Sequence, residues 1–377
     1  MNPEYEKIYL EAKKNWDDIA KPIDSLGTLE GDVAKLCAIK GSAEPPVLKK
    51  RALLVFGADH GVVKEGVTQT DSSVTRIVMQ NFCTGNACTA IMAENANCDV
   101  YPVDIGMLQE NNNDSDGTKD KTEKNSKEKS SGESENTNSS LKMHQINNRN
   151  IRHGTGDIFV EDAMIPEECR RAIEEGMNLV CELKELDYDI VLTGEMGIGN
   201  TTPSSALAAL LLDKKAEEVT GRGAGLDEAG YKRKIEVVKE IIQRVQKNSS
   251  GDDEAFYYLY SAGGLEIAAM TGVFLGAEKY QIPAVADGVI SLISAYIAYK
   301  LSPESKNYFL ASHFPKEKAG QIILSVLDMK SVIDAQLALG EGSGGVMMLP
   351  LLDQAISVYQ KMGTFEAYDI GKYERFQ

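Results

Sequence analysis

Short apolar segments alternate with longer helical patterns along most of this chain of 377 residues. Most of the apolar segments end at a glycine, an acidic residue or a histidine, and both of their faces are apolar, which is typical of central strands in a parallel sheet. Because strands that alternate with helices form right-handed crossovers, the pattern predicts an α/β fold with a doubly wound, mostly parallel sheet. The predicted strands are 51–59, 98–106, 188–195, 282–288 and 307–313. The predicted helices are 72–94, 162–186, 203–213, 227–247, 263–277 and 288–301.

The two ends of the chain carry helical patterns and no predicted strand. We therefore expect residues 1–45 and 330–377 to form a small helical domain beside an α/β domain of residues 46–329. The α/β domain contains a polar insertion at 108–149, of which Glu110–Ser140 has no apolar side chain. Such a segment cannot offset its ordering entropy by burying apolar surface, so we expect a disordered surface loop there, or else a linker between domains.

The charge balance is acidic, with 57 Asp+Glu against 40 Lys+Arg and a net charge of −17. Without a basic tract, the chain is not expected to bind nucleic acid or to dock on an anionic membrane. No apolar run approaches the roughly 18 residues of a membrane helix, and we expect no targeting segment. The six cysteines and four histidines show no metal-ligand spacing. We therefore expect reduced thiols in a cytoplasmic protein and no metal site.

Polar groups follow the predicted strands at their carboxyl ends. In open α/β sheets, ligands bind beyond these ends, near the point where the strand order reverses. Any single acidic residue there is also a candidate helix N-cap, but several together favour a site. For the histidine after the first strand, a bond to neighbouring backbone is favoured over a catalytic role. The strand-end residues are Asp59, His60, Asp104, Glu195, Asp287 and His313.

The densest motif is TGEMGIGNTTPSSALAAL at 193–210, in which a strand leads through three glycines into a helix of small residues. Glycines let backbone N–H groups approach an anion, and a helix N-terminus adds a favourable dipole. The spacing matches neither the P-loop nor the dinucleotide fingerprint. The motif is therefore either a phosphate site of another kind or a tight structural turn.

Two further glycine-rich segments precede helices. In TGRGAGLDEAGYKRKIEVV at 220–238, one of Lys232, Arg233 and Lys234 completes an anion site, or all three are solvated. In LALGEGSGG at 337–345, Glu341 lies between two glycines. Its carboxylate either faces a ligand closely or serves as a favourable acid at a helix start.

Taken together, these segments resemble the nicotinate-nucleotide–dimethylbenzimidazole phosphoribosyltransferase family. The segments are KPIDSLGTLE, ADHGVVKEGV, GEMGIGNTT, GRGAGLD, GGLEIAAMTG, ADGVIS and LGEGSGG, and they occur in this order over nearly the whole chain outside the insertion. The resemblance implies a Rossmann-like parallel sheet, a small helical domain and a homodimer. It also implies that phosphoribose passes from nicotinate mononucleotide to 5,6-dimethylbenzimidazole, giving α-ribazole 5′-phosphate and nicotinate for the lower ligand of cobalamin.

The same resemblance assigns roles to residues of this chain. The glutamate of the LGEG turn, which is the family's general base, falls on Glu341. No cofactor is implied, since one base can take the proton that the incoming benzimidazole loses. The substrate-binding positions, including those that hold the product and its phosphate, fall on Thr70, Glu195, Gly197, Gly199, Asn200, Lys234 and Asp287.

Two positions depart from the usual family pattern and leave the acceptor open. Asp24 replaces a glycine in the KPIDSLG segment, and Ile77 stands where a glutamine is expected to line the base pocket. Another benzimidazole, adenine or a phenol is therefore an alternative acceptor. A catalytically silent nucleotide-binding protein is the alternative from another class, and an oxidoreductase is disfavoured because GxGxxG is missing.

Overall fold

The computed structural model describes residues 3–109, 141–248 and 253–375. Its described strands form one parallel sheet in the spatial order β3-β2-β1-β4-β5-β6. The order reverses between β1 and β4, so the predicted doubly wound sheet is confirmed. The strands are β1 (Arg51–Ala58), β2 (Asp99–Gly106), β3 (Asn147–Asn148), β4 (Ile190–Met196), β5 (Ala284–Ala286) and β6 (Phe309–Ala311).

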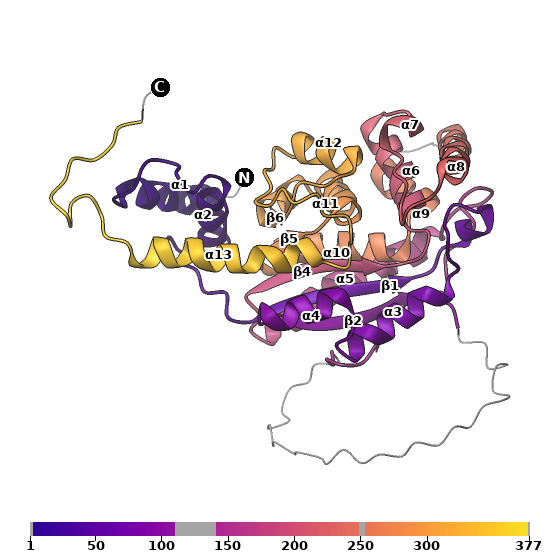
Figure 1. The fold of residues 1–377 in the computed structure, drawn as a ribbon, viewed down its shortest axis with the longest axis horizontal. Coiled ribbons are helices and arrows are strands. Elements are labelled where there is room, and N and C mark those ends of the chain that lie inside the picture. Colours follow the sequence, from indigo (N-terminus) through magenta and orange to yellow (C-terminus); the bar gives the residue numbers. More distant parts are fainter. Residues whose placement is uncertain (1–2, 110–140, 249–252, 376–377) are drawn as a thin grey trace, which may run out of the picture.

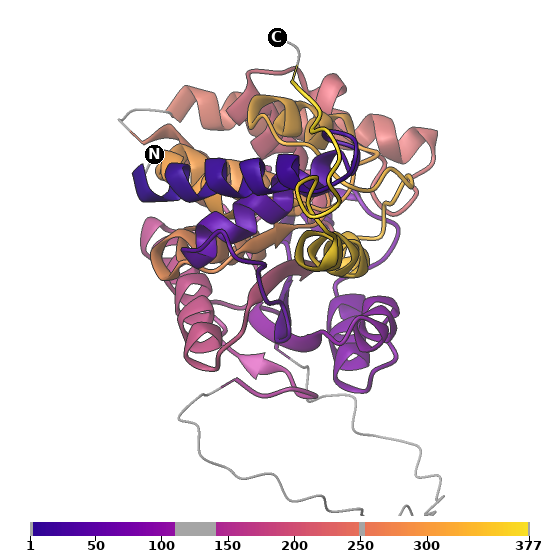
Figure 2. The ribbon, with the colours of Figure 1, turned by 90° about the vertical axis from the view of Figure 1, so that its left-hand side faces the viewer.

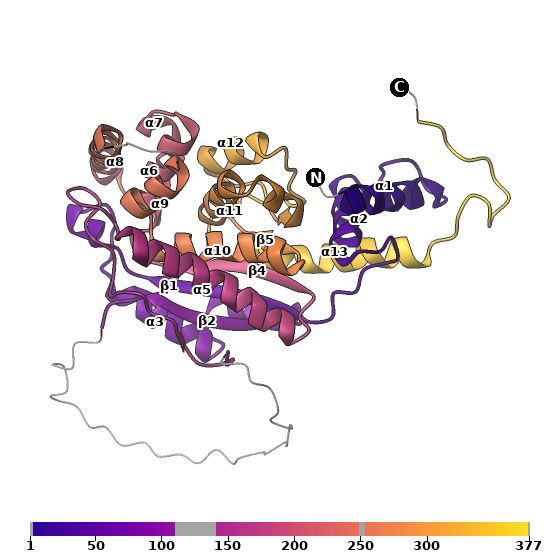
Figure 3. The ribbon, with the colours of Figure 1, turned by 180° about the vertical axis from the view of Figure 1, so that it is seen from behind.

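Helices cover both faces of the sheet (Figures 1, 2 and 3). One face carries α3 (Ser73–Cys83), α4 (Cys88–Asn95) and the first turns of α13 (Ser343–Lys361). The opposite face carries α5 (Pro166–Glu185) and α10 (Leu265–Tyr280), with α11 (Val289–Leu301) beside α10. All eight residues of β1 are buried between these layers, as the apolar pattern on both faces predicts.

Close packing of α5 on α10 explains two glycines in these helices. A Cβ atom on Gly176 of α5 would lie 1.9 Å from the carbonyl oxygen of Ala269, and one on Gly272 of α10 would lie 2.0 Å from that of Ile173. Any larger residue would therefore force the two helices apart.

The remaining helices lie around the carboxyl edge of the sheet and at the chain ends. Within the described residues, no helix has the length and apolar content needed to cross a membrane. These helices are α1 (Pro3–Asp18), α2 (Thr28–Lys40), α6 (Thr201–Leu212), α7 (Ala216–Val219), α8 (Glu228–Asn248), α9 (Glu254–Ala262) and α12 (Lys318–Val326), with 3-10 turns at η1 (Gly61–Glu65) and η2 (Pro303–Tyr308).

Several boundaries differ from the sequence expectation. The single helix predicted at 72–94 is two helices, α3 and α4, because the chain turns through Gly85 at a φ of 73°. The last two predicted strands shrink to three residues each in β5 and β6. The sequence pattern did not predict β3, α7 or α9.

The chain ends pack against each other through α1, α2 and the far end of α13 (Figure 1). The Trp16 and Tyr359 ring centroids lie 4.8 Å apart, and a buried ion pair joins Lys21 to Glu30 at 2.6 Å. The expected boundary at residue 330 fits less well, because Ile333 bridges to His313 at the sheet edge and α13 begins on the sheet. The division into two domains stays a prediction.

The predicted insertion at 108–149 is only partly within the described residues. Positions 110–140, for which a disordered loop is predicted, lie outside them. Residues 141–149 are ordered, with Leu141 and Asn147 buried and β3 paired to β2. The polar insertion therefore ends earlier than predicted.

Asp24, the departure in the KPIDSLG segment, has a φ of 53°, which explains why a glycine suits this position. Aspartate tolerates this left-handed conformation better than most residues. Its carboxylate accepts hydrogen bonds from Arg375, at 2.7 and 3.0 Å, and from Lys13, at 3.3 Å. The bonds from Arg375 above all lower the pKa of Asp24 to about 2. This departure from the family pattern therefore lies at the protein surface, where the two chain ends meet.

Candidate active site

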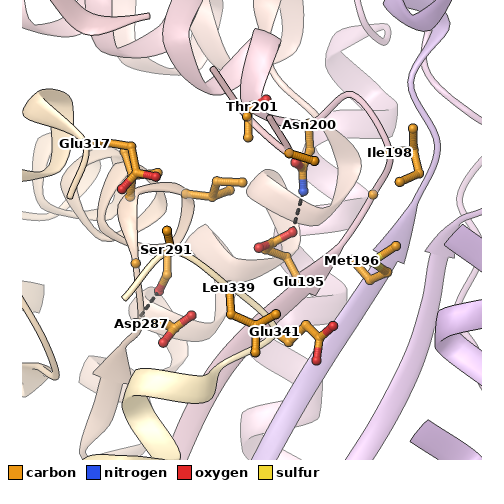
Figure 4. A pocket seen from close by; sticks show the side chains of 18 of the residues that line it. Glu195, Met196, Ile198, Asn200, Thr201, Asp287, Ser291, Glu317, Leu339 and Glu341 are labelled. Carbon is orange, nitrogen blue, oxygen red and sulfur yellow. Dashed lines mark hydrogen bonds between the residues drawn. The ribbon is translucent and has the colours of Figure 1, made fainter. Parts of the chain in front are cut away.

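A cavity of about 250 Å³ opens at the carboxyl edge of the sheet, beside the point where the strand order reverses (Figure 4). It is lined by the turns after β4 and β5, the start of α6, and loop residues 67–69, 222–226 and 337–341. All three glycine-rich segments therefore meet at one site. This is the place where a doubly wound sheet is expected to bind a ligand.

Glu341 lies in a strained turn on the wall of this cavity. Gly340, Glu341 and Gly342 have φ values of 80°, 60° and 85°, all in the left-handed region. A non-glycine residue in this region costs free energy, so the surrounding structure must hold the turn in place. The half-buried Glu341 carboxylate turns toward α4, where its Oε2 accepts a hydrogen bond from the Thr89 hydroxyl at 3.1 Å.

Asp287 supplies that support from the end of β5. Its carboxylate accepts backbone N–H bonds from Gly342, Gly344 and Gly345 at 3.1, 2.7 and 3.3 Å, and so caps α13. Burial raises the pKa of Asp287 to about 7, although these bonds act in the opposite direction. Asp287 lines the cavity, as expected, but its oxygens face the turn that carries Glu341.

Glu195, at the end of β4, lies beside this turn (Figure 4). The Asn200 side chain donates a hydrogen bond to Glu195 Oε2. A Cβ atom on Gly340 would lie 2.5 Å from Oε1, and the φ of 80° at this position also favours glycine. Burial, followed by the charges of Glu266 and Asp287, raises the pKa of Glu195 well above its ordinary value. A neutral Glu195 can donate as well as accept a hydrogen bond.

Lys234 does not line the cavity itself but lies behind Thr201 and Gly223, which do. Its ammonium donates to the hydroxyl of Thr201, the first residue of α6, at 2.6 Å, and lies 3.3 Å from a Cβ built on Gly223. The side chain is fully buried, and burial lowers its pKa to about 8. Lys232 is exposed, while Arg233 pairs with Glu65 at 3.2 Å. Of the three candidate cations, the structure brings only Lys234 to the α6 N-terminus.

The glycines of the GEMGIG loop are fixed by packing as well as by their place at the cavity. A Cβ on Gly197 would lie 2.6 Å from the Ala58 carbonyl oxygen, and one on Gly199 would lie 2.8 Å from Val63. Gly199 also has a φ of 90°. The loop is thus a tight structural turn that still lines the cavity, so the two interpretations of the motif are compatible.

His60 does not bond to neighbouring backbone, so the favoured prediction for it is wrong. Its Nε2 lies 3.1 Å from Oε1 of Glu266, at the start of α10, and both side chains are almost completely buried. Burial alone lowers the pKa of His60, but the charge of Glu266 and a hydrogen bond to it outweigh burial, and the net pKa is raised. The pair lies directly beneath Gly197 and Gly264, where added Cβ atoms would touch it.

Lys234 and His60 are not the only predicted positions that do not line the cavity. Asp104 accepts from the Met107 N–H and the Asn150 amide, each at 2.8 Å, and so holds a neighbouring loop. Thr70 is exposed, whereas Thr68 and Gln69 line the cavity in its place. Ile77 is also exposed and does not reach the cavity wall, so the expected substitution in the base pocket is not found at this position.

Sequence reasoning missed three residues at the site. Arg222 lines the cavity from the second glycine loop, and Glu317 lines it from the start of α12. Thr89 contacts Glu341 from α4. The GRG motif flanking Arg222 was a usable signal, whereas Thr89 and Glu317 belong to no motif.

Known proteins resemble this chain over nearly its whole length. A family model described as a phosphoribosyltransferase matches residues 1–370. A curated nicotinate-nucleotide–dimethylbenzimidazole phosphoribosyltransferase from Ruminiclostridium cellulolyticum is 36% identical, over 97% of this chain and 94% of its own. The chain belongs to this family. A phosphoribosyltransferase of the same name from Clostridium acetobutylicum is 34% identical, over 98% of this chain and 95% of its own.

Solved structures agree with this phosphoribosyltransferase assignment. The crystal structure of CobT from Thermus thermophilus matches with a TM-score of 0.83 and 30% identity, covering 97% of this chain and 100% of that one. A second crystal structure, of a nicotinate-nucleotide–dimethylbenzimidazole phosphoribosyltransferase from the same organism, gives a TM-score of 0.82 at 30% identity, over 99% of this chain and 100% of that one. The family resemblance inferred from the sequence is confirmed.

Proposed function

We propose that the chain transfers phosphoribose from nicotinate mononucleotide to 5,6-dimethylbenzimidazole, with Glu341 as the general base. The observation that carries the proposal is the Glu341 carboxylate, held in a constrained turn on the wall of the cavity that the three glycine-rich motifs share. The family membership supports the reaction itself. The products are α-ribazole 5′-phosphate and nicotinate.

The chemistry needs a base but no acid at the leaving group. The bond between the ribosyl carbon and nicotinate breaks, and its electron pair returns to the pyridine nitrogen, which becomes neutral. A benzimidazole nitrogen attacks the same carbon from the opposite face, which gives an α-linked product. The proton lost by the benzimidazole passes to Glu341. Holding both substrates in line supplies much of the acceleration.

The phosphate is assigned to the start of α6. Gly197, Gly199 and Asn200 bring the chain into that helix, and Lys234 supplies the buried positive charge. Helix N-termini favour anions, so this end of the cavity suits a phosphate. Glu195 is assigned to the ribosyl region between this end and Glu341, whereas we assign to Asp287 the role of fixing the Glu341 turn.

Three further features are expected of a member of this family. They are a homodimer, a cytoplasmic location and a substrate contact from Thr70. None of them is needed for the chemistry above, and each stays a prediction.

An acceptor panel tests the proposed function. The chain is incubated with nicotinate mononucleotide and a series of benzimidazoles, adenine and phenols, and nicotinate and the ribosylated products are quantified. We expect nicotinate release only when an acceptor is present, and fastest with 5,6-dimethylbenzimidazole. Release with none of the acceptors would favour a silent nucleotide-binding protein, and preference for a purine or phenol would reassign the acceptor.

Replacing Lys234 by alanine should raise the KM for nicotinate mononucleotide by about tenfold and change kcat less, because a point charge on a phosphate acts in ground and transition states alike. In the wild type, the same KM should rise above pH 8, because Lys234, with a pKa of about 8, then loses its proton. Steady-state kinetics across this pH range measure both effects.

Lys232→Ala is the matched control, since Lys232 is exposed on the same helix. Its KM should stay at the wild-type value. An unchanged KM in Lys234→Ala would remove Lys234 from the phosphate site and direct attention to Arg222, another cation at the cavity.

A further inference from the structure

Thr89 occupies an unusual place at the start of α4. It is the second residue of the helix, its side chain is fully buried, and the preceding N-cap residue is Ala87, which supplies no side-chain acceptor. The first N–H groups of a helix lack partners within the helix and are normally satisfied by a polar N-cap side chain. The start of α4 must therefore draw its acceptor from elsewhere in the fold.

Glu341 supplies that acceptor. Its Oε2 receives the Thr89 hydroxyl at 3.1 Å and the Thr89 backbone N–H at the longer distance of 3.5 Å. A buried hydroxyl without a partner costs free energy, so the two groups depend on each other. Glu341 is thus anchored twice, through its backbone turn by Asp287 and through its carboxylate by α4.

The two carboxylate oxygens of Glu341 differ in the hydrogen bonds that they accept. Oε2 faces the two donors of Thr89, whereas no described residue donates a hydrogen bond to Oε1. Bonds to one oxygen restrict the rotamer of the carboxylate. A base must be held within a fraction of an ångström of the proton that it takes, because small misplacements are costly in rate.

We propose that Thr89 is a positioning residue for the base: by holding Oε2, it leaves Oε1 as the atom that takes the benzimidazole proton. This inference rests on the proposed role of Glu341. Thr89 itself touches neither substrate in this arrangement. Its hydroxyl remains bonded to Oε2 while the proton moves to Oε1 and nicotinate departs with the electron pair of the broken bond.

Removing only the hydroxyl tests the inference. Thr89→Val has nearly the same shape and keeps the backbone N–H, so we expect kcat to fall by about tenfold, as for one lost hydrogen bond to a charged group. The KM for nicotinate mononucleotide should not change, because Thr89 is remote from the phosphate end. Thr89→Ser keeps a hydroxyl and should restore most of the lost turnover. If valine lowers the melting temperature, Thr89→Ala removes the same hydroxyl without a branched side chain and should show the same kcat loss.

Thr84→Val is the matched control, since Thr84 is exposed just before α4 and its hydroxyl donates to the Asn81 carbonyl oxygen at 3.2 Å. It should turn over like the wild type. In a Glu341→Gln background, Thr89→Val should cause no further loss of kcat, because the base that it positions is already gone.

The outcomes separate this inference from the proposed function. Full turnover in Glu341→Gln would show that Glu341 is not the base. A large loss in Glu341→Gln together with wild-type kcat in Thr89→Val and Thr89→Ala would keep the base and overturn the positioning role. A loss that serine does not restore would also overturn it.

Discussion

Replacing Glu341 by glutamine should lower kcat by roughly 10²–10⁴, the usual contribution of a general base, while the melting temperature stays nearly unchanged. Glutamine keeps the size of the side chain, and its carbonyl oxygen can still accept the Thr89 bonds at the start of α4. What it loses is the capacity to take a proton. Turnover and thermal unfolding should be measured on the same preparation.

Glu341→Ala separates the catalytic role from the capping role. Alanine removes the acceptor for α4 as well as the base, so this variant should lose stability by about 1 kcal/mol in addition to turnover. If Glu341 served only as a cap, the glutamine variant would be nearly as active as the wild type. In that case Glu195, which lines the cavity, would be the next candidate for the base.

Replacing Glu266 by glutamine should lower the free energy of unfolding by about 3–5 kcal/mol, because it leaves the buried His60 without its opposite charge. The His60 and Glu266 side chains are 1% and 0% exposed, so solvent screens this pair little. Urea unfolding of both proteins measures the difference. The double variant His60→Gln with Glu266→Gln should lose less than the sum of the two single variants.

The pH dependence of that difference has a definite sign. The pKa of His60 is raised in the folded protein, so the stability contributed by the pair is fully present below the unfolded value of 6.5 and is lost as pH rises through the folded value. The gap between wild type and Glu266→Gln should therefore shrink above pH 6.5. A gap that is constant or widens with pH would show that His60 is not charged.

In the wild type, Asp287 also makes the stability of the fold decrease as pH rises. With a pKa of about 7 against an ordinary 3.8, the folded state holds a proton that the unfolded state has lost between these values, so stability falls as pH rises through that window. Because Glu266→Gln leaves Asp287 in place, this contribution cancels in the difference between the two proteins.

The central strands could be predicted because burial on both faces leaves a clear apolar run. β1 is buried along its whole length, whereas β5 and β6 have three residues each and β3 only two, too few for any period to appear. The break between α3 and α4 carried a signal in Gly85, but the apolar pattern continues across it. Pattern length therefore set the limit of the fold prediction.

At the candidate site, the glycine-rich segments located Glu195, Asn200, Lys234 and Glu341, because close backbone approach demands glycine whatever the ligand. Which buried side chains pair with one another could not be predicted in the same way. His60 pairs with Glu266 from α10, a contact that depends on how distant elements pack. Thr89 lies outside every motif, and its role depends on a turn at the other end of the chain.

A crystal structure of the chain with α-ribazole 5′-phosphate bound tests the assignment of the cavity most directly. We expect phosphate oxygens within hydrogen-bond distance of the α6 N-terminus and Thr201, with Lys234 beside them. The benzimidazole nitrogen that lost its proton should face Oε1 of Glu341, with Thr89 still bonded to Oε2. A phosphate bound away from α6, or a benzimidazole turned away from Glu341, would contradict the assignment.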